Sequence, residues 1–125
     1  MKANENLMVG DWVKFKGSDL YHQVKVVSNK SIKFDNQKWF AKSSVEPISL
    51  TPEILEKNGF VLKEEDVGAF GVNIVPYYTR DDVPFEVFCD GEPFAIWFKD
   101  PVNIAFVHQL QHALRLCGIE KEIVL

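Results

Sequence analysis

The chain has 125 residues, of which 46% are hydrophobic and 26% are charged, and its formal net charge is −4. This length makes one domain or two very small ones, and the hydrophobic content excludes an intrinsically disordered chain. A polar start and the lack of an apolar run of about 20 residues exclude a signal peptide and a membrane span, so we expect a cytoplasmic protein with no membrane partner. The two cysteines, Cys89 and Cys117, are too few for a disulfide framework and are expected to be reduced thiols.

The charge is divided unevenly along the chain. Residues 1–50 contain eight lysines against five acidic residues, whereas residues 51–125 contain six basic residues against thirteen acidic ones. The first part is therefore mildly basic and the second is acidic. Such a division suits either docking of the two parts on each other or an acidic partner for the first part.

Residues 1–50 show short strands separated by tight turns, at residues 9–16, 20–28, 31–34, 38–41 and 45–48. Residues 9–13 resemble the first strand of SH3-like barrels, so we predict a small SH3-like β-barrel. Its interior is expected to contain Val13, Phe15, Val24, Val26, Ile32 and Phe34. Its outer face is expected to carry the candidate binding residues Trp12, Lys14, Tyr21, Lys25 and Lys33, with Lys38 beside them.

Residues 51–125 are predicted to form an α+β domain that begins with a short helix. Thr51 is a good N-cap, Pro52 suits the first helical position, and Gly59 suits the position after the end. Expected strands follow at residues 60–63 and 70–79, then a hairpin at residues 85–98, and finally a C-terminal strand at residues 120–125.

The hairpin is predicted from Asp90-Gly91, a preferred two-residue type I′ turn. Such a turn pairs Cys89 with Glu92, Val87 with Phe94, and Phe85 with Ile96. The face expected to be buried against the long helix is Phe85, Val87, Phe94, Ile96 and Phe98. The opposite face is expected to carry Glu86, Phe88, Pro93 and Trp97, of which Phe88 and Trp97 are candidate partner-binding residues.

A long helix is predicted over residues 101–117, with Asp100 as N-cap, Pro101 at the first position and Gly118 after the end. Its expected core stripe is Asn103, Phe106, Val107, Leu110, Ala113, Leu114 and Cys117. On a helical wheel His108 and His112 are about 40° apart and point away from that stripe.

The segment His108-Gln109-Leu110-Gln111-His112 resembles the zinc-protease pattern H-E-x-x-H. Gln109 stands where the general base should be, and no third ligand has a recognisable spacing. We therefore expect outward-facing histidines, no catalytic residue and no cofactor, with His108 and His112 as weak metal candidates. A metal-binding protein or degenerate zinc hydrolase remains one alternative.

A second alternative is nucleic-acid binding through the barrel, because aromatic residues among lysines can stack on bases and neutralise phosphates. Residues 1–50 contain no arginine, however, and the whole chain is acidic, whereas nucleic-acid modules are usually more basic. Lysines on exposed strands also guard against edge aggregation.

Two stretches, residues 50–60 and residues 108–119, resemble a group of small uncharacterised proteins of gut Bacteroidetes and their prophages. The similarity covers roughly a quarter of the chain closely and the rest in outline. It implies a bacterial or phage-encoded accessory protein, and it implies no activity, substrate or site.

The sequence thus predicts an α+β fold: an SH3-like barrel at residues 1–50, then an antiparallel sheet covered by one long C-terminal helix at residues 51–125. We expect a non-enzymatic interaction module that binds another protein or a second copy of itself. The reasons are the missing catalytic chemistry and the aromatic outer faces.

Overall fold

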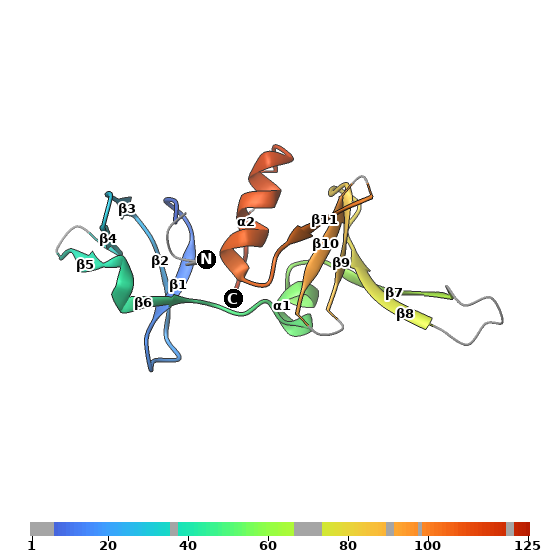
Figure 1. Cartoon of the computed structure of the whole chain (residues 1–125), viewed down its shortest axis with the longest axis horizontal. Helices are drawn as coiled ribbons and strands as arrows, with labels where there is room; N and C mark the ends of the chain where they lie inside the picture. Colours follow the sequence, from blue (N-terminus) through green and yellow to red (C-terminus); the bar gives the residue numbers. More distant parts are fainter. Residues whose placement is uncertain (1–6, 36–37, 67–73, 90–91, 98, 120–121) are drawn as a thin grey trace. The chain divides into compact units, whose positions relative to one another are not determined.

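The computed structural model describes residues 7–35, 38–66, 74–89, 92–97, 99–119 and 122–125 (Figure 1). The fold is mixed α+β, with antiparallel strand pairs and one long helix. The chain divides into two compact units. Unit 1 is residues 1–49 with residues 106–108, and unit 2 is residues 50–105 with residues 109–125.

Unit 1 contains two small antiparallel sheets, ordered β2-β1-β6 and β3-β4-β5. Among the described residues these strands form no closed barrel, so the structure establishes two three-stranded sheets rather than the barrel itself. Five strands were expected, and the second is divided in two. The elements are β1 (Trp12–Phe15), β2 (Tyr21–Gln23), β3 (Val26–Val27), β4 (Ser31–Lys33), β5 (Phe40–Ala41), the 3-10 turn η2 (Lys42–Ser44) and β6 (Val45–Pro47).

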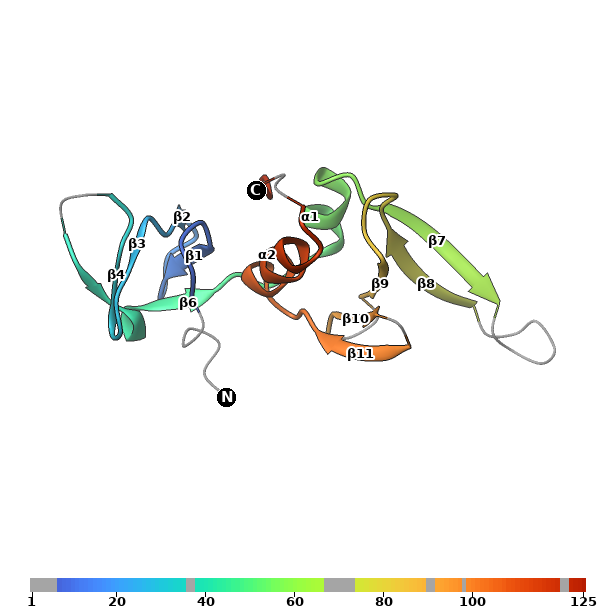
Figure 2. The ribbon, with the colours of Figure 1, turned by 90° about the horizontal axis from the view of Figure 1, so that it is seen from above.

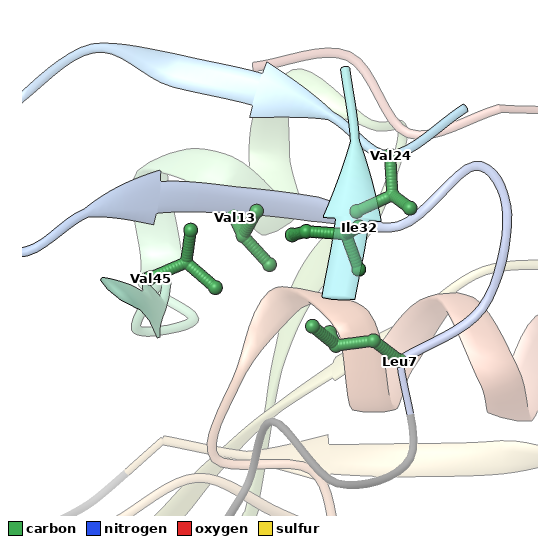
Figure 3. Close-up of a cluster of buried hydrophobic side chains, with 5 residues drawn as sticks. All are labelled: Leu7, Val13, Val24, Ile32 and Val45. Carbon is green, nitrogen blue, oxygen red and sulfur yellow. The ribbon is translucent and has the colours of Figure 1, made fainter. Parts of the chain in front are cut away.

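Alternating apolar residues of these strands form the core of unit 1. Its buried members are Leu7, Val13, Val24, Ile32 and Val45 (Figure 3). The rings of Phe15, Phe34 and Phe40 pack against this cluster and against one another, with centroids 4.9 to 5.8 Å apart.

One core prediction in unit 1 is wrong. Val27, and not Val26, packs against the buried cluster, because Val27 pairs with the buried Ile32 while Val26 pairs with Lys33. The strand is interrupted after Val24, whose N–H bonds to Asp11 O at 2.8 Å. This interruption shifts, by one residue, the alternation between side chains that face the core and side chains that face the solvent.

Unit 2 is built on one five-stranded antiparallel sheet in the order β11-β10-β9-β8-β7. The helices α1 and α2 lie side by side in both views (Figures 1 and 2). Leu55 of α1 and Leu110 and Leu114 of α2 are buried. The elements are α1 (Pro52–Lys57), β7 (Val61–Asp66), β8 (Ile74–Thr79), β9 (Phe85–Phe88), β10 (Phe94–Trp97), β11 (Asp100–Asn103) and α2 (Val107–Leu116).

The predicted boundaries of α1 are confirmed. The Thr51 hydroxyl accepts from Ile54 N at 3.3 Å, and Pro52 occupies the first turn. Gly59 has a φ of 87°, a left-handed conformation that suits glycine at a helix end. The next residue, Phe60, is buried and its N–H bonds to Leu55 O, which completes the end of the helix.

The predicted start of the long helix is wrong. Asp100–Asn103 is the edge strand β11, and α2 begins at Val107, whose N–H bonds to Ile48 O at 2.8 Å. A proline suits the first turn of a helix, but it also suits an edge strand, which does not need its N–H. Pairing of Pro101 with Ile96 of β10 decides between the two.

The β9–β10 hairpin forms as predicted, but its register is wrong by one residue. Phe94 pairs with Phe88, Ala95 with Val87, and Trp97 with Phe85. Five residues therefore connect Phe88 to Phe94, instead of the two expected at Asp90-Gly91, which lies outside the described residues together with Phe98. A shift of one residue moves each partner side chain to the opposite face of the sheet.

The end of the chain is held by the side chain of Asn58 and does not form the predicted strand at its described residues, 122–125. Asn58 is buried; its Oδ1 accepts from Val124 N at 2.7 Å, and its Nδ2 donates to Val124 O and to Ile54 O, each at 2.8 Å. Lys57 Nζ donates to Leu125 O at 2.7 Å. One amide thus joins the end of α1 to the segment that follows α2.

We predict that Asn58→Ala lowers the free energy of unfolding by about 3 kcal/mol, because it removes the three hydrogen bonds that the buried Asn58 amide makes to Ile54 and Val124. Lys57→Ala removes only an exposed contact and should change stability by less than about 0.5 kcal/mol. Urea unfolding followed by circular dichroism measures both. Equal stabilities for the two variants would contradict the role assigned to Asn58.

The C-terminal end of α2 provides a second stability test. Gly118 has a φ of 74°, and a Cβ added there would meet nothing within 4 Å. Gly118→Ala should therefore lower the free energy of unfolding by about 1 kcal/mol through backbone strain alone. Asparagine tolerates a left-handed conformation better than alanine, so Gly118→Asn should lower the free energy of unfolding by less than Gly118→Ala does. A thermal unfolding series ranks the three proteins.

Candidate functional site

The two faces of the five-stranded sheet differ in burial. On one, which we call the core face, Tyr78, Phe85, Val87 and Ala95 are buried. Burial raises the pKa of the Tyr78 hydroxyl, and the nearby Glu56 carboxylate of α1 raises it further.

The opposite face, which we call the open face, is formed by the alternate residues of the same strands. Among the described residues, none of the side chains on this face is buried. Cross-strand pairing places one residue from each strand in a single row. That row is Lys63, Tyr77, Phe88, Phe94 and Asn103.

The three central members of this row are aromatic rings in contact. Phe88 and Phe94 stack with centroids 5.3 Å apart and planes 13° apart, and Tyr77 lies 5.7 Å from Phe88. The Phe88 and Phe94 rings are therefore nearly parallel and stack on each other, and Tyr77 extends the row of rings to a third strand.

A second row on the open face has a different character. It contains Val61, Thr79, Glu86, Ile96 and Pro101. Lys63 and Glu86 are both exposed and stand on β7 and β9, the two strands that flank β8. The open face thus combines an aromatic centre with charged residues of both signs, among them Lys63 and Glu86.

Shallow hollows lie at both ends of the open face. One of about 510 Å³ includes Val61, Lys63 and Thr79 in its lining, and one of about 420 Å³ includes Phe94, Pro101 and Asn103. The aromatic row therefore forms a ridge between two depressions.

The Arg80 side chain closes the turn beside the first hollow. Its guanidinium pairs with the Asp82 carboxylate through Nε and Nη2, and its Nη1 donates to Asn58 O at 3.0 Å. It also lies over the Phe60 ring, 5.1 Å from the centroid. These contacts hold Arg80 in a structural role, joining the end of α1 to the turn after β8.

Phe88 and Trp97 were predicted to share one face, and this prediction is wrong. Phe88 belongs to the open face, whereas Trp97 pairs with Phe85 and its ring lies 5.5 Å from the Phe85 ring. Tyr77, Phe94 and Lys63, which join Phe88 on the open face, were not selected from the sequence. The alternation of inward and outward side chains along β8 could have placed Tyr77 on this face from the sequence. Placing Phe94 there required the register of the β9–β10 hairpin.

The lysine and aromatic residues predicted on unit 1 are divided between its two sheets. Register places Trp12, Lys14 and Tyr21 on one face of the β2-β1-β6 sheet. Lys33 lies on β4 in the other sheet, with its Nζ 4.5 Å from the centre of the Trp39 ring, and Lys25 precedes β3.

Several of these lysines have contacts within unit 1. Lys14 forms an ion pair with Glu46 at 3.5 Å, and Lys25 Nζ donates to Gln23 at 3.3 Å. Lys38 lies over the Phe40 ring, with its Nζ 5.4 Å from the centroid. The ion pair reduces the net positive charge that Lys14 offers to a phosphate.

The histidine pair does not have the predicted outward orientation. His108 is only 2% exposed and its ring stacks on Phe106 at 6.1 Å, while His112 is half-buried. The buried residues of α2 span roughly 220° of the helical wheel, so the stripe expected from the sequence was too narrow. They are Val107, His108, Leu110, Gln111, Ala113 and Leu114.

The remaining chemical groups offer little support for a metal centre. No group of three or more histidine, cysteine or acidic side chains in the described part of the chain is placed to hold a metal ion. No helix within the described ranges is long and apolar enough to cross a membrane.

Cys89 and Cys117 are half-buried thiols. Burial raises the pKa of both, and the Asp82 carboxylate raises that of Cys117 further. A raised pKa lowers the fraction of reactive thiolate at neutral pH.

We therefore predict that both cysteines react with iodoacetamide at pH 7 several times more slowly than free cysteine does. Mass spectrometry of the intact protein over time measures the two rates. In denaturant the rates should rise to that of the free amino acid. A native thiol that reacts as fast as free cysteine would contradict the burial assigned to it.

Comparison with known proteins gives no relative: no family model, no curated protein and no solved structure matches the chain.

Proposed function

We propose that the protein is a non-enzymatic interaction module that binds a protein partner through the open face of its five-stranded sheet. The observation that supports this proposal is the contact row of Tyr77, Phe88 and Phe94 across three neighbouring strands. An antiparallel sheet with one solvated face normally carries polar side chains there. Three adjacent half-buried aromatic residues depart from that pattern and are typical of the centre of a protein interface.

The orientation of the rings favours a protein over a nucleic acid at this surface. Nucleobases bind by stacking flat on an exposed ring face. In the open-face row the rings of Phe88 and Phe94 already stack on each other, which leaves less ring face for a base. Residues 51–125 also carry a strong excess of acidic side chains, which repels phosphates.

For unit 1 we propose an SH3-like arrangement of its two sheets. The strand order, with β2 and β3 as two halves of one bent strand and a 3-10 turn before β6, suits such a barrel. In unit 2 we propose that α2 packs on the core face. In this proposal the packed side of each unit supports an exposed sheet face that a partner can contact.

A second candidate function is nucleic-acid binding by unit 1, because Trp12, Lys14 and Tyr21 share one sheet face. Titration of the full chain with single- and double-stranded DNA and RNA at low salt tests it. Binding that weakens with salt and with Lys14→Ala would support this function. Absence of salt-dependent binding would remove it.

The main proposal is tested by affinity capture with the full chain as bait, comparing the wild type with Phe88→Ser. Loss of a large apolar anchor should reduce retention of a specific partner, or of a second copy, at least about tenfold. Trp39→Ser is the matched control, because Trp39 is 47% exposed on unit 1. Thermal unfolding of both variants checks that the fold is retained.

If Phe88→Ser lowers stability too far, Lys63→Glu gives the same test without removing a ring. Retention that is equal for the wild type and for every open-face variant would reject the open face as the interaction surface.

A further inference from the structure

We infer that β7, the edge strand of the five-stranded sheet, binds an extended, basic segment of a partner protein, which adds to the sheet as a further antiparallel strand. This surface is the rim of the sheet and not its open face. The inference therefore does not depend on the proposed function.

The two edges of the sheet differ in what they offer to another strand. At one edge, β11 has four residues and includes Pro101, which has no backbone N–H to donate. At the other edge, β7 has six residues and no proline, and each of the six pairs with β8 in one continuous register. In the described part of the chain no strand pairs with the outer side of β7. Its outward N–H and C=O groups therefore form an uninterrupted row that another strand can hydrogen-bond.

The ribbon formed by β7 and β8 also stands to gain stability from a third strand. Six residue pairs join β7 to β8, whereas within the described ranges β8 pairs with β9 at one position, Tyr78 with Val87. The outer part of the ribbon extends beyond that position, away from the two helices (Figures 1 and 2). Two strands alone are marginal in water, and three are considerably more stable. A strand added along β7 therefore stabilises the ribbon that binds it.

The first half of β7 provides apolar contacts for such a strand. Val61 is 55% exposed and Leu62 is 44% exposed, and neighbouring residues of a strand point to opposite faces of the sheet. Apolar side chains of the added strand can pack beside each of them as cross-strand neighbours. Val61 also lines the hollow of about 510 Å³ at this edge, which can receive one of these side chains.

The charges along β7 determine which kind of strand fits. β7 contains one lysine and ends in the three acidic residues Glu64, Glu65 and Asp66, so its net charge is −2. The hollow beside its first residue also includes the exposed Asp81. An acidic strand would be repelled along this edge, whereas lysine or arginine side chains would be attracted.

The same charges exclude a second copy of β7 as the added strand. Pairing two β7 strands brings two net charges of −2 together, which destabilises the pair. Like charge protects an edge against its own copy but admits a strand of opposite charge. The proline of β11, by contrast, removes a donor that any added strand would need. A basic segment of another protein is therefore the occupant that suits β7.

Hydrogen exchange followed by NMR tests the inference, with a peptide of about eight residues that alternates valine with lysine as the probe. With the full chain and about 1 mM peptide, alternate backbone amides of β7 should exchange at least about tenfold more slowly. The reason is that every second N–H of an edge strand is directed at the added strand. The amides of β11 are the internal control and should not change.

Matched peptides and variants test the charge. A peptide that alternates valine with glutamate should give no protection. Glu64→Lys should weaken binding of the valine–lysine peptide about fivefold, because it replaces an attraction on β7 with a repulsion. Glu86→Lys makes the same change of charge on the central strand β9 and should alter binding less than about twofold. Thermal unfolding checks that both variants keep the fold.

Three results would overturn the inference. They are no protection of β7 at about 1 mM peptide, protection without the alternating pattern, and equal binding of the two peptides. Equal weakening by Glu64→Lys and Glu86→Lys would also reject β7 as the edge that reads the charge. Alternating protection of β7 supports the inference whether or not Phe88→Ser affects capture of a partner, so the open face and the edge are judged separately.

Discussion

The pairing of Phe88 with Phe94 across β9 and β10 is the constraint on which the candidate site depends. This register fixes the face on which each side chain of the hairpin lies. It puts Val87 and Ala95 together on the core face and joins the two phenylalanine rings on the open face. A register one residue away would place Phe94 on the core face and break the aromatic row.

Two polar side chains of unit 2, the buried Asn58 and the half-buried Arg80, stabilise the fold. Asn58 ends α1 and holds the backbone of Val124, and Arg80 connects the end of α1 to the turn after β8. Both act across long stretches of sequence, joining segments 66 and 22 residues apart. They tie the end of α1 to the end of the chain and to the turn after β8.

The two units expose chemically different surfaces. Unit 1 carries Trp12, Lys14 and Tyr21 on one sheet, with Lys14 paired to Glu46. Unit 2 carries the row of aromatic rings on its open face, with Lys63 and Glu86 on neighbouring strands. A surface of mixed charge with apolar rings at its centre suits protein contact, because apolar burial supplies the affinity and charge pairing supplies the specificity.

Local signals in the sequence determined several elements correctly. The cap at Thr51 and the left-handed Gly59 depend on contacts within a few residues, which a sequence pattern can report. The existence of the β9–β10 hairpin was also predicted correctly, from the turn signal at Asp90-Gly91, although its register was not.

The tertiary structure decided the features on which function depends. Residues 100–103 form a strand because β10 offers a pairing partner, although the same residues suit the start of a helix. His108 is buried because α2 packs over a wider arc than an amphipathic stripe indicates. The open face exists because a longer connection shifts the hairpin by one residue. Each outcome depends on contacts between segments that are distant in the sequence. The energies of these contacts outweigh local conformational propensity, and short sequence patterns do not report them.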